Sequence, residues 1–273
     1  MQKGFSRVRI WVYVGFAALL FVLTWIWTGQ IDSDLGISDF ASGWVLLGII
    51  AFLSLFSARK RLSFLPLASS SRWFLLHVVC GFLALFLFWL HTGAVWPRGL
   101  YEQMLTTLFY ITSISGILGL IMEKVYPLQL TRSGVEIIYE RIPTEIAAIR
   151  EEVESLVLKC TEETGSSTLA QHYIETLRQY FLKPRFFINN IFDGQAAQHW
   201  VRQQRMILER FLDERERIYM DKVFALADKK RKIDFHYTLQ TLLKTWLLAH
   251  IPLATAVVAM VIWHIVLIFV FFV

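Results

Sequence analysis

Residues 77–91 read HVVCGFLALFLFWLH, and residues 250–264 read HIPLATAVVAMVIWH. Each stretch is apolar, contains no Asp, Glu, Lys or Arg, and begins and ends with a histidine. The two histidines of each stretch are fourteen positions apart, which in a helix is just under four turns and about 21 Å of rise. They therefore face nearly the same side of a helix, one near each end.

The composition places both stretches in a membrane protein. Of the 273 residues, 56% are hydrophobic and 18% are charged, against about 25% charged in ordinary soluble domains. A spanning helix needs about 20 mostly apolar residues. Five segments meet this requirement, at about residues 10–28, 41–58, 73–91, 104–122 and 245–273. The first is longer than the 7–15 apolar residues of a cleavable signal, so we expect it to be an anchor.

Charges in the connecting segments predict the orientation. The N-terminal tail and the second loop carry only basic residues, and the first loop carries only acidic ones. Basic segments stay in the cytoplasm, so we expect a cytoplasmic N-terminus, a cytoplasmic region 123–244 and an external C-terminus, by default in a bacterial-type cytoplasmic membrane. The residues concerned are Lys3, Arg7 and Arg9; Asp32, Asp34 and Asp39; and Arg59, Lys60, Arg61 and Arg72.

The region 123–244 reads as a helical domain inserted between the fourth and fifth spans. It holds 19 of the 27 basic and 18 of the 22 acidic residues, so it has no net basic patch that would suit a nucleic acid. Pro143 suits a first helical turn. Thr168 and Gln171 predict a capping box for a second helix, which Lys183-Pro184 ends. No nucleotide, metalloprotease or serine-hydrolase motif occurs.

A third, long helix is predicted to begin near Gln195. Lys229–Lys232 would form its last turn, and Asp234 would cap the helix that enters the membrane. A single unbroken helix is the competing interpretation. The charged run from Glu214 to Arg217 is interpreted as a solvated face, and His172 and His199 as structural or solvent-facing.

The four histidines of the two stretches are the candidate functional residues. The third and fifth spans are separated by one returning helix and therefore run parallel. His77 and His250 then lie on the cytoplasmic side, and His91 and His264 on the outer side. A lone membrane histidine is often only hydrogen-bonded to a neighbouring helix, but two equal spacings at matching depths favour ligands.

Haem suits such pairs better than zinc does. Zinc takes four ligands, commonly including thiolates or carboxylates, and Cys80 is the only thiol in these two spans. Haem takes two axial ligands and needs an apolar slot. Small residues would leave room for it, namely Gly81, Ala84, Gly93, Ala254 and Ala256, with Gly116 and Gly119 allowing close helix approach. Flat side chains would line it, namely Phe82, Phe86, Phe88, Trp89 and Trp263.

With these stretches the sequence resembles the di-haem membrane b-type cytochromes. The use of the third and fifth helices is similar to the transmembrane domain of ferric reductases and NADPH oxidases, and the same spacing occurs in quinol-oxidising cytochrome b. The resemblance covers about residues 73–122 and 245–273. It implies two haem b groups, without the flavin domain of the oxidases and without the P-E-W-Y quinol motif.

The expected architecture is all-α, with five transmembrane helices in residues 1–122 and 245–273 and a helical domain between them. The expected function is electron relay across the membrane, as a subunit of an oxidoreductase complex or as a homo-oligomer in membrane lipid. A quinone, a multihaem cytochrome or an iron–sulfur protein are the candidate partners, and whether the chain is itself an enzyme stays open. Two polar clusters could contact a quinone or a haem propionate: Trp96, Arg98, Tyr101 and Glu102 outside, and Arg72, His236 and Lys244 inside.

Two functions of other classes compete with electron relay. A non-redox adaptor or assembly protein would act through the helical domain, with the histidines serving only in packing. A metal-ion transporter would use the histidines, but carboxylates are missing from both histidine-bearing spans.

Overall fold

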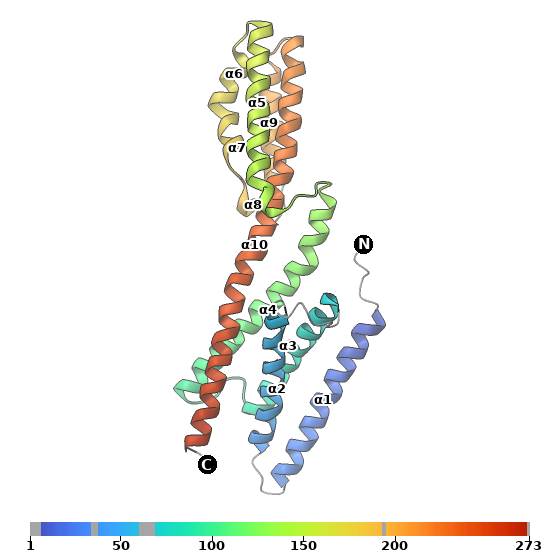
Figure 1. Ribbon diagram of the computed structural model, residues 1–273, viewed down its shortest axis with the longest axis vertical. Coiled ribbons are helices and arrows are strands. Elements are labelled where there is room, and N and C mark those ends of the chain that lie inside the picture. The colour runs from blue at the N-terminus through green and yellow to red at the C-terminus, as the bar shows by residue number, and fades with distance from the viewer. Residues whose placement is uncertain (1–6, 34–37, 60–68, 193–194, 272–273) are drawn as a thin grey trace. The chain divides into compact units, whose positions relative to one another are not determined.

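The computed structural model describes residues 7–33, 38–59, 69–192 and 195–271, and every element in these ranges is helical (Figure 1). Lys3, Asp34, Lys60 and Arg61, on which part of the predicted orientation rests, lie outside the described residues. The chain divides into two compact units. Unit 1 comprises Met1–Ile121 and Trp246–Val273, and unit 2 comprises Met122–Thr245.

Unit 1 contains the membrane-spanning parts of five helices. They are α1 (Arg7–Ser33), α2 (Ser38–Arg59), α3 (Ser70–Thr92), the first part of α4 (Leu100–Arg132) and the last part of α10 (Glu214–Phe271). All five helices are long and apolar enough to cross a membrane. The predicted all-α architecture is therefore confirmed, and a helix long and apolar enough to cross a membrane lies at each of the five predicted spans.

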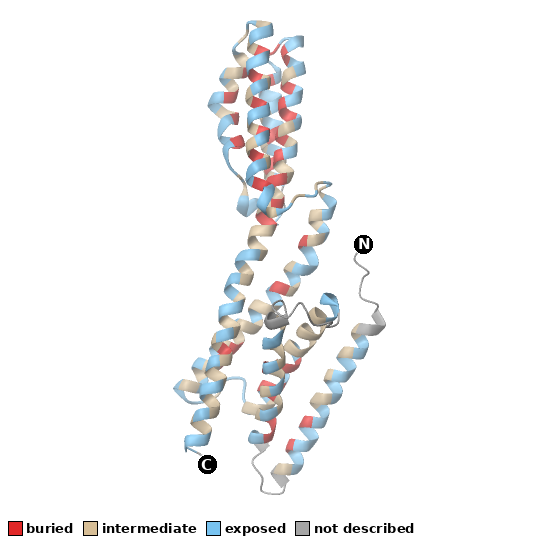
Figure 2. Ribbon diagram, in the orientation of Figure 1, coloured by how far each residue is buried: buried red, intermediate tan, exposed pale blue. Residues whose placement is uncertain are grey.

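The helices of unit 1 bury few residues and expose many large apolar ones. Figure 2 shows α1 as mostly exposed or intermediate, and its exposed side chains include Trp11, Phe16 and Trp25. An apolar helix surface of this kind suits lipid, because lipid does not penalise exposed hydrocarbon. A small core forms around Leu87, with the residues Leu46, Ile50, Leu83, Ala84, Phe88, Phe109 and Val257.

Gly93 has a different place from the one expected. It was predicted to leave room beside the histidines, but it ends α3 in the left-handed conformation, with φ at 61°. Its backbone N–H donates to the carbonyl of Trp89. Glycine suits this position because it adopts positive φ without a steric penalty.

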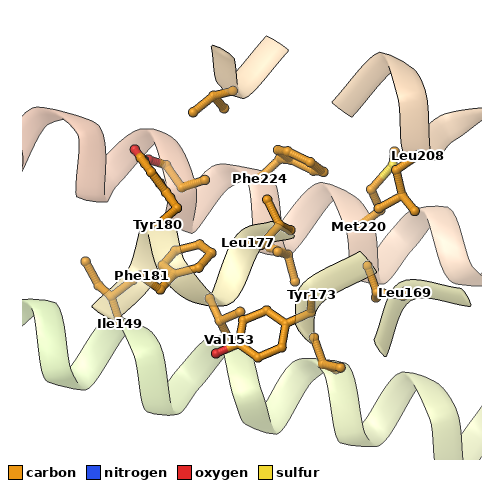
Figure 3. Packing of buried hydrophobic residues seen from close by; sticks show 14 of the residues in the cluster. Ile149, Val153, Leu169, Tyr173, Leu177, Tyr180, Phe181, Leu208, Met220 and Phe224 are labelled. Atoms are coloured by element: carbon orange, nitrogen blue, oxygen red, sulfur yellow. The ribbon is translucent and has the colours of Figure 1, made fainter. Parts of the chain in front are cut away.

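Unit 2 is a helical domain with its own hydrophobic core. It contains α5 (Ile142–Thr164), α6 (Thr168–His172), a π-helical turn (Tyr173–Leu177), α7 (Arg178–Leu182), α8 (Phe187–Phe192), α9 (Gln195–Glu209) and the first part of α10. A 3₁₀ turn, Tyr139–Arg141, precedes α5. Figure 3 shows Ile149 and Val153 of α5 facing Tyr173, Leu177 and Phe181, with Phe224 of α10 on the other side.

The first two predicted helices of this domain are present, but the capping prediction is wrong. Pro143 lies in the first turn of α5, and α7 ends at Leu182, just before Lys183-Pro184. The amide of Gln171, however, donates to the carboxylate of Glu175 at 2.9 Å instead of capping the helix. Glu175 lies one helical turn after Gln171, in the π-helical turn that follows α6, where side chains four residues apart are neighbours.

The predicted long helix from Gln195 breaks at residues 210–213, and no break follows at 229–234. The side chain of Asp213 accepts a hydrogen bond from the Glu216 N–H at 2.8 Å, and that of Glu216 accepts one from the Asp213 N–H at 3.0 Å. This reciprocal pair is a capping box, which starts α10 at Glu214. Glu216 is buried, so the prediction of a solvated face is wrong for this residue.

The expected cap at Asp234 is also wrong, because α10 continues through it to Phe271. Its carboxylate instead accepts a hydrogen bond from Lys230, one turn earlier, at 2.5 Å. Both side chains are buried. The cluster Lys229–Lys232 therefore lies inside α10 and does not end a helix. Its member Lys230 forms a buried ion pair with Asp234.

Candidate functional site

His91 on α3 and His264 on α10 lie beside each other. Their ring centres are 6.4 Å apart and the ring planes are perpendicular. A metal bonded to one nitrogen of each imidazole, at about 2 Å from each, would hold the two ring centres about 6–6.5 Å apart. The observed spacing therefore suits two imidazoles that share one metal ion.

The backbone carbonyl of Asp39 on α2 determines which ring nitrogen of His91 carries the proton. Its Nδ1 lies 2.9 Å from the carbonyl oxygen of Asp39 and 3.1 Å from the hydroxyl of Ser42. Because a carbonyl oxygen only accepts, Nδ1 is the donor and Nε2 keeps its lone pair. Metal-binding histidines are usually oriented in this way.

A glycine on α2 makes room for His91. A Cβ atom at Gly43 would lie 2.9 Å from Cε1 of His91, closer than side-chain carbon atoms pack. The histidine spacing in the sequence gives no hint of Asp39, Ser42 or Gly43 as its neighbours. The only signal is the Ser-Gly pair in an apolar helix, since small residues mark close helix contacts in membranes.

Tyr101 on α4 fixes the other ring of this pair. It stacks on His264 with ring centres 6.1 Å apart and planes 6° apart. Its hydroxyl donates to the carbonyl of Met260 at 2.5 Å. Of the predicted outer cluster, Tyr101 thus touches the pair, whereas Trp96 and Arg98 are exposed.

His77 on α3 and His250 on α10 line one cavity of about 220 Å³. Nδ1 of His250 lies 3.2 Å from the hydroxyl of Ser115, and its ring stacks on Trp246 with centres 5.2 Å apart. His77 packs against Phe56, and its Nδ1 has no hydrogen-bond partner among the described residues. The pairing of His77 with His250 and of His91 with His264 shows that α3 and α10 run parallel.

The cavity is apolar and has flat walls. Helices α2, α3, α4 and α10 all contribute to it. Among the described residues that line it, the two histidines are the only ionisable ones. This cavity, which residues of both histidine-bearing helices line, is the apolar slot between α3 and α10. A planar apolar group with two axial ligands fits this donor set and lining.

Most of the small residues expected around the slot line it, but several of the flat ones do not. Gly81, Ala84, Gly116, Gly119 and Ala254 are in the lining, together with Phe82. Phe86 and Trp263 are exposed instead. Phe88 stacks on Phe109 in the core, and the indole of Trp89 donates to the hydroxyl of Tyr110. Helical periodicity explains the exposure of Phe86 and Trp263, because aromatic residues on the far side of a helix face lipid.

The donor sets fit haem better than zinc. Within the described ranges, no three His, Cys, Asp or Glu side chains come together in a way that could hold a metal ion. A zinc site needs three or four protein ligands. The two imidazoles of each pair would suffice for haem, which takes only two ligands from the protein.

The remaining histidines lie in unit 2 and have other surroundings. His236 is buried and its Nε2 lies 2.7 Å from the hydroxyl of Ser133. His172 is half-buried and His199 is exposed. Lys244, of the predicted inner cluster, pairs with Glu140 at 2.7 Å. His236 and Lys244 of the predicted inner cluster therefore both have partners within unit 2.

Comparison with known protein families, with curated proteins and with solved structures finds no match for this chain.

Proposed function

We propose that this protein is a membrane b-type cytochrome, in which two bis-histidine haems relay electrons across the bilayer. The observation that carries the proposal is the doubled histidine pair: two histidines of α3 meet two of α10 in the same order, one pair 6.4 Å apart and the other at a shared apolar slot. When bound, haem supplies reversible one-electron redox chemistry.

Neighbouring residues orient the histidine rings by hydrogen bonding and by stacking. Asp39 and Ser115 hold the Nδ1 side of His91 and His250, so that each Nε2 faces away from its hydrogen-bond partner. Tyr101 and Trp246 restrict ring rotation by stacking. Preorganised ligands of this kind bind metal more tightly, because less conformational freedom is lost on binding.

The proposed electron relay also requires an electron donor and an electron acceptor. Two imidazoles per iron leave no open coordination position for oxygen, so electrons must arrive from and leave to other molecules. A quinone in the lipid or a redox protein, such as a multihaem cytochrome or an iron–sulfur protein, would serve at either face. The chain would then be the electron-transfer subunit of an oxidoreductase complex.

A reduced-minus-oxidised absorption spectrum of the purified protein tests the proposal. We expect the α band of a b-type cytochrome, a haem content of about two per chain, and low-spin iron in electron paramagnetic resonance, because both axial positions are filled by imidazole. Protein purified from haem-replete cells without any haem would refute the proposal.

Histidine variants test the pairing. We expect His91→Ala to remove one haem and His250→Ala to remove the other, each leaving about one haem per chain. The exposed His199 of unit 2 supplies the matched control, so His199→Ala should retain both. If His91→Ala and His264→Ala removed different haems, the pairing would be wrong.

A non-redox adaptor is the second candidate function. Unit 2 favours it, because this unit has a hydrophobic core of its own and could act as a separate binding module. The spectrum distinguishes the two functions directly, because an adaptor needs no haem.

A further inference from the structure

Helix α8 of unit 2 exposes apolar side chains on one face. Ile188 and Phe192 are one helical turn apart, and they are 69% and 82% exposed. On the opposite face Asn190 is buried, and its amide donates to the hydroxyl of Thr238 on α10 at 3.4 Å. The helix is therefore fixed to α10 by one face while its apolar face is left without a protein partner among the described residues of unit 2.

The contacts of this segment show which way it runs along α10. The backbone N–H of Arg185 donates to Asp234, and the side chain of Asn190 donates to Thr238. From Arg185 to Asn190 the segment thus advances by one turn of α10 in the direction of Thr245, the last residue of unit 2. Phe192 lies two residues further on.

This direction carries α8 toward the end of unit 2 at which the apolar span follows in the sequence. Thr238 is seven residues before Thr245, about 10 Å along a helix, and the apolar span follows Thr245 directly in the sequence. A headgroup layer about 5–7 Å thick covers each side of the hydrocarbon core. A phenylalanine beyond the level of Thr238 reaches that layer. Figure 1 shows α8 at the end of unit 2 opposite the turn between α9 and α10.

The segment before α8 is held in a conformation that the chain would not adopt by itself. Phe186 has a φ of 61° although it is not a glycine, and such a residue costs about 1–3 kcal/mol. Lys230 donates to the carbonyl of Lys183, and Asp234 accepts from Arg185. The buried ion pair therefore fixes the chain immediately before α8 and sets the direction in which α8 leaves it.

The charge around α8 suits a lipid surface. Lys183 and Arg185 are exposed directly before it, and basic residues beside apolar ones are the usual composition of helices that lie in a membrane interface. We propose that α8 is an interfacial membrane anchor, with Ile188 and Phe192 inserted among lipid headgroups. This anchor does not depend on the proposed haems.

The full-length protein in phospholipid nanodiscs tests this anchor by spin labelling. The background carries Cys80→Ala, while Cys160 is buried and stays unlabelled. Nitroxide labels are attached to Phe192→Cys and, as the matched control, to Phe211→Cys. Phe211 is also an exposed phenylalanine of unit 2, but it precedes Glu214, which lies 31 residues before Thr245, about 46 Å along a helix.

We expect the ratio of oxygen to nickel-chelate accessibility to be several-fold higher at position 192 than at 211, because oxygen concentrates in lipid and the chelate stays in water. Ile188→Cys gives a second reading that should agree with position 192. Equal ratios at 192 and 211 would overturn the proposal. Shielding of position 192 from both reagents would also overturn it, since a protein partner or a second copy would then cover α8.

Discussion

Lys230 and Asp234 are the most deeply buried charges among the described residues of unit 2. Besides Asp234, Lys230 contacts the carbonyl of Lys183 at 3.1 Å and lies 4.3 Å above the ring of Tyr180. Burial raises the pKa of Asp234 to about 6, although the neighbouring ammonium group favours its carboxylate form. Such a pair is costly to desolvate, and each charge depends on the other.

Removing one partner should destabilise the domain more than removing both. We expect Lys230→Met to lower the free energy of unfolding by about 3–5 kcal/mol, because it leaves Asp234 buried without its counter-charge. The double variant Lys230→Met/Asp234→Leu should recover most of this loss. Denaturant unfolding of the purified protein, followed by circular dichroism, measures both. A double variant as unstable as the single one would contradict this account.

His236 should make unit 2 sensitive to acid. Burial lowers the pKa of His236, and its Nδ1 is buried with no hydrogen-bond partner in the part of the chain that the structure describes. The unfolded chain takes up a proton near the ordinary pKa of 6.5, whereas the folded chain resists it. The stability from the neutral ring is therefore complete above about pH 6.5 and is lost as the pH falls below that value.

Hydrogen exchange checks this expectation. Between about pH 7.5 and 5.5, after correction for the intrinsic exchange rate, protection of residues 133–141 should fall, and His236→Gln should reduce that fall. Asp234, whose raised pKa acts in the opposite direction, is present in both proteins and cancels in the comparison. His199→Gln, at an exposed position, should behave as the unchanged chain does. An identical fall in all three proteins would exclude His236 as its source.

At the scale of elements, α3 and α10 carry the histidines, while α4 supports His264 through Tyr101 and His250 through Ser115. Gly116 and Gly119 lie on α4 one turn apart. A Cβ atom at Gly116 would lie 3.7 Å from Cε1 of His250, an ordinary contact, whereas one at Gly119 would overlap the indole of Trp246. Trp246 has little freedom to move, because it donates to the carbonyl of Ser115 and stacks on His250.

The same substitution at these two glycines should have different effects. Gly119→Ala should cost about 1–3 kcal/mol through overpacking and should displace Trp246 from His250. Gly116→Ala should be close to neutral. Thermal unfolding in detergent compares the two variants. Under the proposed function, the haem spectrum should also change in Gly119→Ala alone. Equal melting temperatures would show that α4 adapts to the added methyl group.

Two sequence patterns in unit 2 differ in how well they predict helix boundaries. The D-x-x-E pattern at Asp213–Glu216 is a capping signal, but as part of a charged run it was interpreted as a solvated face. The basic cluster at Lys229–Lys232 resembles a helix end yet lies inside α10. In both cases one charged side chain of the run, Glu216 or Lys230, is buried in unit 2. Each then bonds a partner inside the domain instead of facing solvent.

At the scale of the whole molecule, the charges of the loops predict sidedness. Acidic and basic loops alternate along the first three spans, as expected of a chain that crosses back and forth. The loop at Gly165 should then lie in the cytoplasm and the loop at Val95 outside. This orientation decides which histidine pair meets which compartment.

Cysteine labelling in intact cells tests the orientation. In a Cys80→Ala background, Val95→Cys should react with a membrane-impermeant maleimide from outside, and Ser166→Cys should react only after the cells are opened. Val95 is exposed and Ser166 is half-buried, so a reagent can reach both positions. Reaction of Ser166→Cys in intact cells would reverse the orientation.

The sequence by itself determined the five apolar helices, the separate helical region and the equal spacing of the four histidines. These features follow from local hydropathy and helical periodicity, which a single segment expresses without its neighbours. The same periodicity predicted that α3 and α10 present two histidines each to one side.

Only the tertiary structure decided which residues hold the histidines and which charges are buried. Asp39 and Ser42 meet His91 across 52 and 49 sequence positions, Gly43 lies against the same ring, and Ser115 meets His250 across 135. Lys230 and Asp234 are one turn apart on α10, but Lys183 meets Lys230 only when the segment after α7 packs on α10. Contacts of this kind depend on how helices approach one another, and that is set by packing of whole faces, which no local pattern records.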